Sequence, residues 1–150
     1  MKNERSPPEK VMAIKIREMD ISDYAVCQPL WRDAGMHHEP DFHNRLATLL
    51  TQNPGLSLVA LEENEICGCI LGSYNGFSGY VFRLVVDPKV RGAGIGKQLS
   101  LECERKLIRA GAAKVMLACE TELESFYESL GYTRTSARFM MKKLVENDPI

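Results

Sequence analysis

The alternation of apolar and polar residues marks the expected strands of this chain. Residues 13–19 alternate, which predicts a strand with one buried face. Residues 80–86 are almost wholly apolar, as is typical of a strand covered on both faces. Further strands are expected at residues 56–61, 66–71, 114–119, 132–135 and 139–144.

Apolar residues at intervals of three and four predict the helices. The expected helices cover residues 21–34, residues 41–52, a stretch ending near residue 109, and a stretch from Thr121 to just before Gly131. The first contains Pro29, so we expect it to be kinked or split there. Thr121 and Glu124 have the spacing of a capping box, in which each side chain covers a free backbone N–H.

The order of these elements predicts a mixed α/β layer fold. A strand is followed by two helices, a group of strands, a helix, a strand, a helix and closing strands. The strand before the third helix and the strand after it should be parallel, as in half of a βαβ unit. We expect one domain over residues 13–150, preceded by a flexible tail at residues 1–12.

Composition excludes several classes of protein. The net charge of -1 leaves no broad basic surface for nucleic acid. No apolar run reaches the roughly 18 residues of a membrane span, and residues 1–10 lack the apolar core of a secretory signal. The five cysteines are scattered without a C-x-x-C pair, which argues against a disulfide framework and a zinc site. Buried, reduced thiols in a cytoplasmic protein are the expectation.

The segment that carries chemistry is a glycine-rich loop between an apolar strand and a helix. It reads Arg91-Gly92-Ala93-Gly94-Ile95-Gly96-Lys97. Glycines let the backbone approach a ligand, and the free N–H groups of a helix start favour a phosphate. The Rossmann pattern fails because Leu99 stands where its third glycine belongs. The nucleotide P-loop fails because Gln98 stands where a hydroxyl must bind magnesium. The loop by itself therefore favours a phosphate-bearing ligand of unspecified kind.

A second block makes the loop more specific. The strand ends in Asp87-Pro88 before R-x-x-G-x-G, and F-Y-x-x-x-G-Y follows at residues 126–132, about 30 residues after the loop. With these blocks and this order of elements, the chain resembles the GCN5-related N-acetyltransferase (GNAT) superfamily, particularly its small bacterial ribosomal-protein-alanine acetyltransferase type. The resemblance implies a mixed, mostly antiparallel sheet of about seven strands flanked by about four helices. It also implies acetyl-CoA as cosubstrate, with no metal.

The resemblance further implies which residues bind coenzyme A. The backbone of Leu84, Val85 and Val86 would pair with the pantetheine arm. The backbone N–H groups of Gly92, Ala93, Gly94, Ile95, Gly96 and Lys97 would hold the pyrophosphate, with Arg91 opening the loop. Lys97 would add charge near a phosphate, or be a solvated lysine of the first helical turn.

Catalytic roles fall on two further residues. The family's tyrosine corresponds to Tyr127, which would protonate the thiolate of coenzyme A as general acid, or be a core aromatic. Many relatives carry Asn seven residues earlier, whereas this chain has Glu120. Glu120 would act as base, attract a cationic amine, or be an exposed acidic residue. A backbone N–H of Val85 or Val86 would stabilise the oxyanion.

Charged residues elsewhere leave alternatives open. Arg83 is the only charge within its apolar strand; it would bind a substrate carboxylate, reach solvent or pair with a strand neighbour. One stretch gathers residues that can bind metals: His37, His38, Glu39, Asp41 and His43. Pro40 breaks any helix that would align them, which argues against a metal site. The resemblance implies that this region borders the acceptor site, and a solvated loop is favoured over either role.

These observations lead to one expected function and two alternatives. We expect an acetyl-CoA-dependent N-acetyltransferase that acts on a primary amine, of a small molecule or a protein N-terminus, by direct transfer in a ternary complex. The first alternative is a non-catalytic acyl-CoA-binding sensor or regulatory module, and the second is a nucleotide-binding protein. No nucleic acid or membrane partner is expected, and a homodimer formed through edge strands is compatible with the resemblance.

Overall fold

The computed structural model describes residues 13–146 and residue 148, so the expected tail lies outside the described residues. Its centre is a five-stranded sheet in the order β1-β2-β3-β4-β5. The strands are β1 (Ile14–Glu18), β2 (Leu58–Glu62), β3 (Glu65–Tyr74), β4 (Gly79–Val86) and β5 (Val115–Met116). Neighbouring strands are antiparallel, except that β4 and β5 are parallel. The expected mixed, mostly antiparallel sheet is confirmed.

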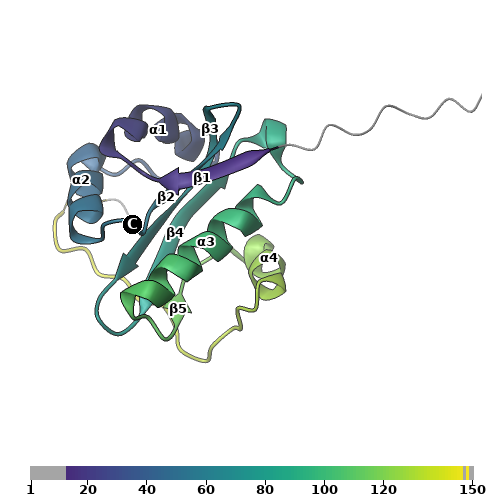
Figure 1. Ribbon diagram of the computed structural model, residues 1–150. Helices are drawn as coiled ribbons and strands as arrows, with labels where there is room; N and C mark the ends of the chain where they lie inside the picture. The colour runs from purple at the N-terminus through teal and green to yellow at the C-terminus, as the bar shows by residue number, and fades with distance from the viewer. Residues whose placement is uncertain (1–12, 147, 149–150) are drawn as a thin grey trace, which may run out of the picture.

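Helices cover both faces of this sheet. The α-helices are α1 (Tyr24–Asp33), α2 (Phe42–Gln52), α3 (Ile95–Ala110) and α4 (Glu124–Ser129). Short 3-10 turns are η1 (Ile21–Asp23), η2 (Pro88–Val90) and η3 (Thr121–Leu123). In Figure 1, α1 and α2 lie on one side of the sheet, and α3 and α4 on the other. Within the described residues, no helix has both the length and the apolar character that crossing a membrane requires.

The core is divided by the sheet into two clusters. The cluster on the α3 side joins Ile95, Leu99, Cys103 and Leu107 to buried strand residues that include Ile70 and Val81. The cluster on the α1–α2 side joins Cys27, Trp31, Phe42 and Leu46 to strand residues that include Leu71 and Val85. The apolar runs in the sequence therefore supply both faces of the sheet.

A bulge in β4 changes which face its side chains point to. Cys69 pairs with Val85 and Leu71 with Phe82, so two residues of β4, Arg83 and Leu84, lie opposite one residue of β3. Val81 packs in the α3-side cluster, whereas Val85 packs in the α1–α2-side cluster. Four positions apart, these two valines would share a face in a regular strand. The extra residue reverses the alternation, as β-bulges do.

The prediction of two closing strands, at residues 132–135 and 139–144, is wrong. Residues 132–146 form no strand, and the strand expected at residues 114–119 shortens to Val115–Met116. A strand needs a partner ladder, and a two-residue β5 offers very little of one. Residues 139–145 instead expose most of their large apolar side chains. The sheet accordingly has five strands in the described residues rather than about seven.

Two local expectations also differ from the structure. The α1 helix runs through Pro29 without a split. The capping box of Thr121 and Glu124 is not formed, because η3 begins at Thr121 with Glu120 as its N-cap, and no side chain caps it. The Glu124 carboxylate is engaged elsewhere, in an ion pair with Arg134. This pair ties the start of α4 to the segment that follows it.

Candidate active site

The glycine loop leads into the N-terminus of α3. Gly92 and Gly94 have φ angles of +86° and +77°, a region that residues with a Cβ rarely adopt. Gly94 is the N-cap of α3, and its carbonyl accepts a hydrogen bond from Gln98 N at 3.0 Å. The first N–H groups of the helix have no intrahelical acceptor, and the helix dipole adds positive charge there. The loop therefore presents the donor set that an anion requires.

Within the described residues, no strand pairs with the outer edge of β4 along most of its length. It pairs with β5 only at Gly79 and Tyr80. β5 ends at Met116, the partner of Tyr80, so no strand within the described residues covers the outer edge at residues 81–86. Backbone groups on such an edge can pair with an extended ligand as with another strand. Leu84, Val85 and Val86, to which the resemblance assigns the pantetheine arm, lie on this stretch.

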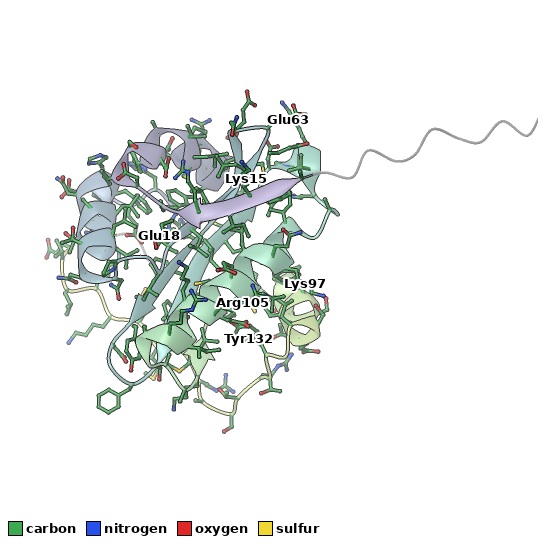
Figure 2. All side chains as sticks on the ribbon, viewed as in Figure 1. Lys15, Glu18, Glu63, Lys97, Arg105 and Tyr132 are labelled. Atoms are coloured by element: carbon green, nitrogen blue, oxygen red, sulfur yellow. The ribbon has the colours of Figure 1, made fainter. Side chains whose placement is uncertain are left out.

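Helix α4 brings the aromatic side chain of Phe126 to the start of α3 and the end of β4. A methyl group built on Gly96 would lie 3.5 Å from Phe126 Cζ, 3.7 Å from Val86 Cγ2 and 3.9 Å from Leu84 Cδ2. The start of α3, the end of β4 and α4 therefore meet around Gly96. The ring of Tyr127 packs edge-on against that of Phe126, with centroids 5.0 Å apart. Figure 2 shows Lys97 and Tyr132 on this α3–α4 side of the sheet.

Tyr127 is half-buried beside a cavity. Its ring meets that of Tyr132 at a centroid distance of 5.6 Å, and both residues line a cavity of about 540 Å³ with Cys119 and Arg134. Burial raises the pKa of Tyr127, and the nearby Cys119 raises it further. The phenol therefore keeps its proton at neutral pH and can donate it to a group on which negative charge develops.

The cavity wall is supported from α3. The Glu104 side chain accepts a hydrogen bond from Tyr132, and burial raises the pKa of Glu104. Burial also raises the pKa of Tyr132. Cys119 is the exposed one of the five cysteines, and burial together with Glu124 and Glu120 raises the pKa of its thiol. Around Tyr127 the structure therefore favours neutral, protonated groups.

Glu120 does not join this group of residues. Its side chain is exposed, and its carbonyl accepts a hydrogen bond from Leu123 N at 2.9 Å. Cys119, one residue earlier, lines the cavity, but Glu120 does not. The loop residues Arg91 and Lys97 are exposed too, with Arg91 Nε donating to Val86 O at 3.3 Å.

Arg83 is held by its own chain on the opposite side of the sheet. Its guanidinium lies 4.6 Å from the ring centroid of Phe42 and donates to His37 O at 2.7 Å. It also pairs with Glu39 at 3.6 Å. A small cavity of about 20 Å³ beside it is lined by His37, His38 and Trp31 among others. The sequence left solvent, a strand neighbour and a substrate carboxylate open, and the structure shows a different partner, the loop between α1 and α2.

The sequence analysis did not identify every residue that lines the two cavities or packs beside the site. Phe126, Cys119 and Trp31 were not singled out, although Phe126 stands in the F-Y block and Trp31 is the single tryptophan of the chain. Their roles depend on which elements pack together. Among residues 13–146 and 148, no three His, Cys, Asp or Glu side chains are placed to hold a metal ion.

Comparison with known proteins decides the family. A family model described as an acetyltransferase (GNAT) domain matches residues 34–145. The chain belongs to the GNAT acetyltransferase family. As a member of it, the protein is an acetyl-CoA-dependent N-acetyltransferase.

Relatives of this GNAT enzyme agree in sequence and fold. It is similar to an acetyltransferase of Pectobacterium atrosepticum, with 30% identity over 142 residues, which cover 91% of this chain and 98% of the relative. Its fold is similar to that of glucosamine-6-phosphate N-acetyltransferase from Arabidopsis thaliana, with a TM-score of 0.67, 24% identity, and coverage of 89% and 99%. A predicted acetyltransferase from Clostridium acetobutylicum, solved with acetyl-CoA, gives a TM-score of 0.70, 16% identity, and coverage of 87% and 96%.

Proposed function

We propose that this GNAT enzyme transfers the acetyl group directly from acetyl-CoA to a primary amine, of a small molecule or a protein N-terminus, in a ternary complex. The observation that carries the proposal is the meeting of three elements around Gly96, where an added Cβ would contact both the end of β4 and Phe126 of α4. This meeting supports the proposal, because it joins the glycine loop and the end of β4 to α4, the helix that carries Tyr127.

Coenzyme A binding is assigned to the loop and to the edge of β4. The N–H groups from Gly92 to Lys97 would hold the pyrophosphate, with the charges of Arg91 and Lys97 in addition. The pantetheine arm would then pair with the backbone of residues 84–86 on the edge that β5 leaves free. The +77° φ of Gly94 supports this assignment, because it turns the chain from the glycine loop into the first turn of α3.

Tyr127 is assigned as the general acid. The neutral amine attacks the thioester carbonyl, the carbon–sulfur bond breaks, and coenzyme A leaves as a thiolate that takes the proton of Tyr127. The new amide nitrogen gives up its extra proton, directly or through water, and this restores the tyrosine. A buried phenol remains protonated until negative charge develops on the sulfur. The backbone N–H of Val85 or Val86 would stabilise the oxyanion that forms at the carbonyl.

Glu120 is assigned to the acceptor amine. An ammonium group has no lone pair, so the amine must lose a proton before it attacks. Glu120 is exposed and lies next to Cys119, a residue of the cavity wall. From there its carboxylate would attract the cationic amine and accept its proton, through water where needed.

A thiol-release assay with acetyl-CoA tests this proposal. The acceptors are a panel of small primary amines and of peptides with free N-termini, and the matched controls are the same compounds with the amine already acetylated. We expect thiol release with at least one free amine and none with its acetylated form. Binding of acetyl-CoA without release for any amine would favour the non-catalytic sensor instead.

A further inference from the structure

We propose that Arg83 is a positioning residue of this enzyme. Its side chain holds the bulge of β4 against α1 and α2, and so fixes the direction of the backbone N–H groups that follow in the strand. The inference rests on the proposed function, since those N–H groups are the ones assigned to the thioester. In the proposed acetyl transfer, Arg83 itself contacts neither acetyl-CoA nor the acceptor amine.

The backbone at the bulge needs to be held. Arg83 has a φ angle of +51°, in the left-handed region that a side chain with a Cβ disfavours. Phe82 packs in the α1–α2-side cluster, and Arg83 lies over Phe42 and Trp31 on the same side. Two consecutive residues of one strand thus point to one face. Such a conformation persists only where surrounding contacts determine it.

Contacts from α1 and α2 reach both the backbone and the side chain of Arg83. Trp31 Nε1 donates to Arg83 O at 3.0 Å. The guanidinium lies 4.6 Å from the ring centroid of Phe42 and 5.9 Å from that of Trp31. Only 13% of the Arg83 side chain is exposed. A cation over an aromatic face is attracted most strongly where water is excluded, as it is here.

The same side chain also holds the loop between α1 and α2. It donates to His37 O at 2.7 Å and pairs with Glu39 at 3.6 Å. Glu39 pairs in turn with Arg45 of α2 at 3.3 Å, and Arg45 with Asp148 at 3.0 Å. The guanidinium is therefore engaged by the chain itself, and a substrate carboxylate would have to displace Glu39.

This arrangement predicts an effect on turnover rather than on cofactor binding. Val85 and Val86 follow Arg83 in β4 by two and three residues, so a change in the bulge would turn the N–H groups assigned to the oxyanion away from the thioester. The pyrophosphate site begins eight residues later at Arg91 and is built by the start of α3, which Arg83 does not contact. An interaction made only in the transition state lowers kcat and leaves KM nearly unchanged when it is removed.

Steady-state kinetics of Arg83→Gly and Arg83→Lys test the inference. Glycine adopts the +51° φ without strain, so it removes the side-chain contacts and leaves the backbone free to keep its conformation. We expect Arg83→Gly to lower kcat about 10- to 100-fold, with KM for acetyl-CoA changed by less than about threefold. Arg83→Lys, which keeps the charge but loses the planar donor, should recover part of kcat.

The matched control is Arg17→Ala, which removes a partly buried ion pair between Asp23 and Arg17 of β1, a strand separated from β4 by β2 and β3. It should destabilise the fold while kcat per folded molecule stays at the wild-type value. Trp31→Phe is a second variant that keeps an aromatic ring but removes the hydrogen bond to Arg83 O together with part of the buried indole ring. It should lower kcat in the same direction as Arg83→Gly.

Amide hydrogen exchange of the protein without substrate separates this inference from the proposed function. In Arg83→Gly, residues 34–41 and 81–87 should exchange about tenfold faster or more, because their shared contacts are lost. This result holds even if the wild type shows no acetyl transfer. Unchanged exchange in both segments would refute the holding role of Arg83. Faster exchange with wild-type kcat would refute the positioning role.

Discussion

At the scale of single residues, the conformation of the backbone separates two kinds of position in this site. Gly92 and Gly94 have positive φ angles, and no other part of the chain lies within 4 Å of where a Cβ would stand. Because glycine has no side chain, it adopts these angles without stabilising contacts. Arg83 uses the same region with a long side chain, and its contacts to Phe42, His37 and Glu39 stabilise it. The sequence predicted the first kind, because glycine is the residue that tolerates such angles. It could not predict the second.

Tyr127→Phe tests the general acid. Removing the hydroxyl leaves the ring contacts with Phe126 and Tyr132 in place. We expect kcat to fall about 100-fold, the usual contribution of a positioned acid, with acetyl-CoA binding retained. The measurement is thiol release alongside calorimetric binding of acetyl-CoA. Tyr74→Phe, which removes a hydroxyl bonded to Gly76 O on a distant hairpin, is the control. Undiminished turnover would exclude Tyr127 as the acid.

Asp23→Asn tests a stabilising ion pair through pH. The Asp23 carboxylate accepts hydrogen bonds from Arg17 at 2.7 and 2.9 Å, and Arg17 lowers the pKa of Asp23. A lowered pKa means that the stabilisation is complete above the unfolded value of about 3.9 and is lost as pH falls through the folded value.

The Asp23→Asn variant should therefore lose about 2 kcal/mol of unfolding free energy at pH 7. The difference from wild type should shrink as the pH falls below about 4. Urea denaturation across this range measures it. Asp33→Asn, in which the substituted carboxylate is 66% exposed, should change little at any pH. A constant difference from pH 7 to pH 3 would contradict the assignment.

At the scale of elements, the positions of helices and strands followed from periodicity, and the ends depended on neighbours. The strand predicted at residues 66–71 extends to Glu65–Tyr74, because β2 and β4 flank it on both sides and supply ladders. The sequence pattern of residues 132–135 and 139–144 also predicts strands. In the structure these residues form none, because β5 has only two residues and offers almost no backbone groups to pair with. Local propensity cannot distinguish the two cases, because the partner strand is not local.

Gly94→Ala tests the junction between the loop and α3. An alanine at a φ of +77° costs roughly 1 kcal/mol and displaces the first turn of the helix. We expect the affinity for acetyl-CoA to fall about tenfold or more, because the N–H groups no longer converge on the pyrophosphate. Isothermal calorimetry measures it. Gly76→Ala, at a φ of +92° and also in open space, has a similar backbone cost but should bind acetyl-CoA normally.

At the scale of the whole molecule, the candidate site lies where the pairing between β4 and β5 ends. The bulge at Arg83 and the short pairing with β5 leave one edge of β4 free, with α3 and α4 at its end. A ligand that fills this opening should stabilise the folded state, since it binds that state alone.

Acetyl-CoA at 100 times its dissociation constant should therefore add about 2.7 kcal/mol to the unfolding free energy. For a chain of this length, that raises Tm by roughly 5 to 10 °C, as scanning fluorimetry would show. ATP and NAD at the same concentrations should give smaller shifts in Tm, because the glycine loop matches neither the P-loop pattern nor the Rossmann pattern. Equal stabilisation by ATP would favour the nucleotide-binding alternative.

The sequence by itself determined the fold class, the glycine loop and the family. Glycines, apolar runs and the F-Y-x-x-x-G-Y block are local signals, and each depends on the chemistry of residues close together in the chain. Only the tertiary structure decided that Gly96 meets Phe126 and Val86, and that Arg83 pairs with the loop before α2 rather than with solvent. These contacts join different elements of the fold, and a bulge of one residue sets those of Arg83. No local pattern encodes that bulge, because packing against α1 and α2 stabilises it.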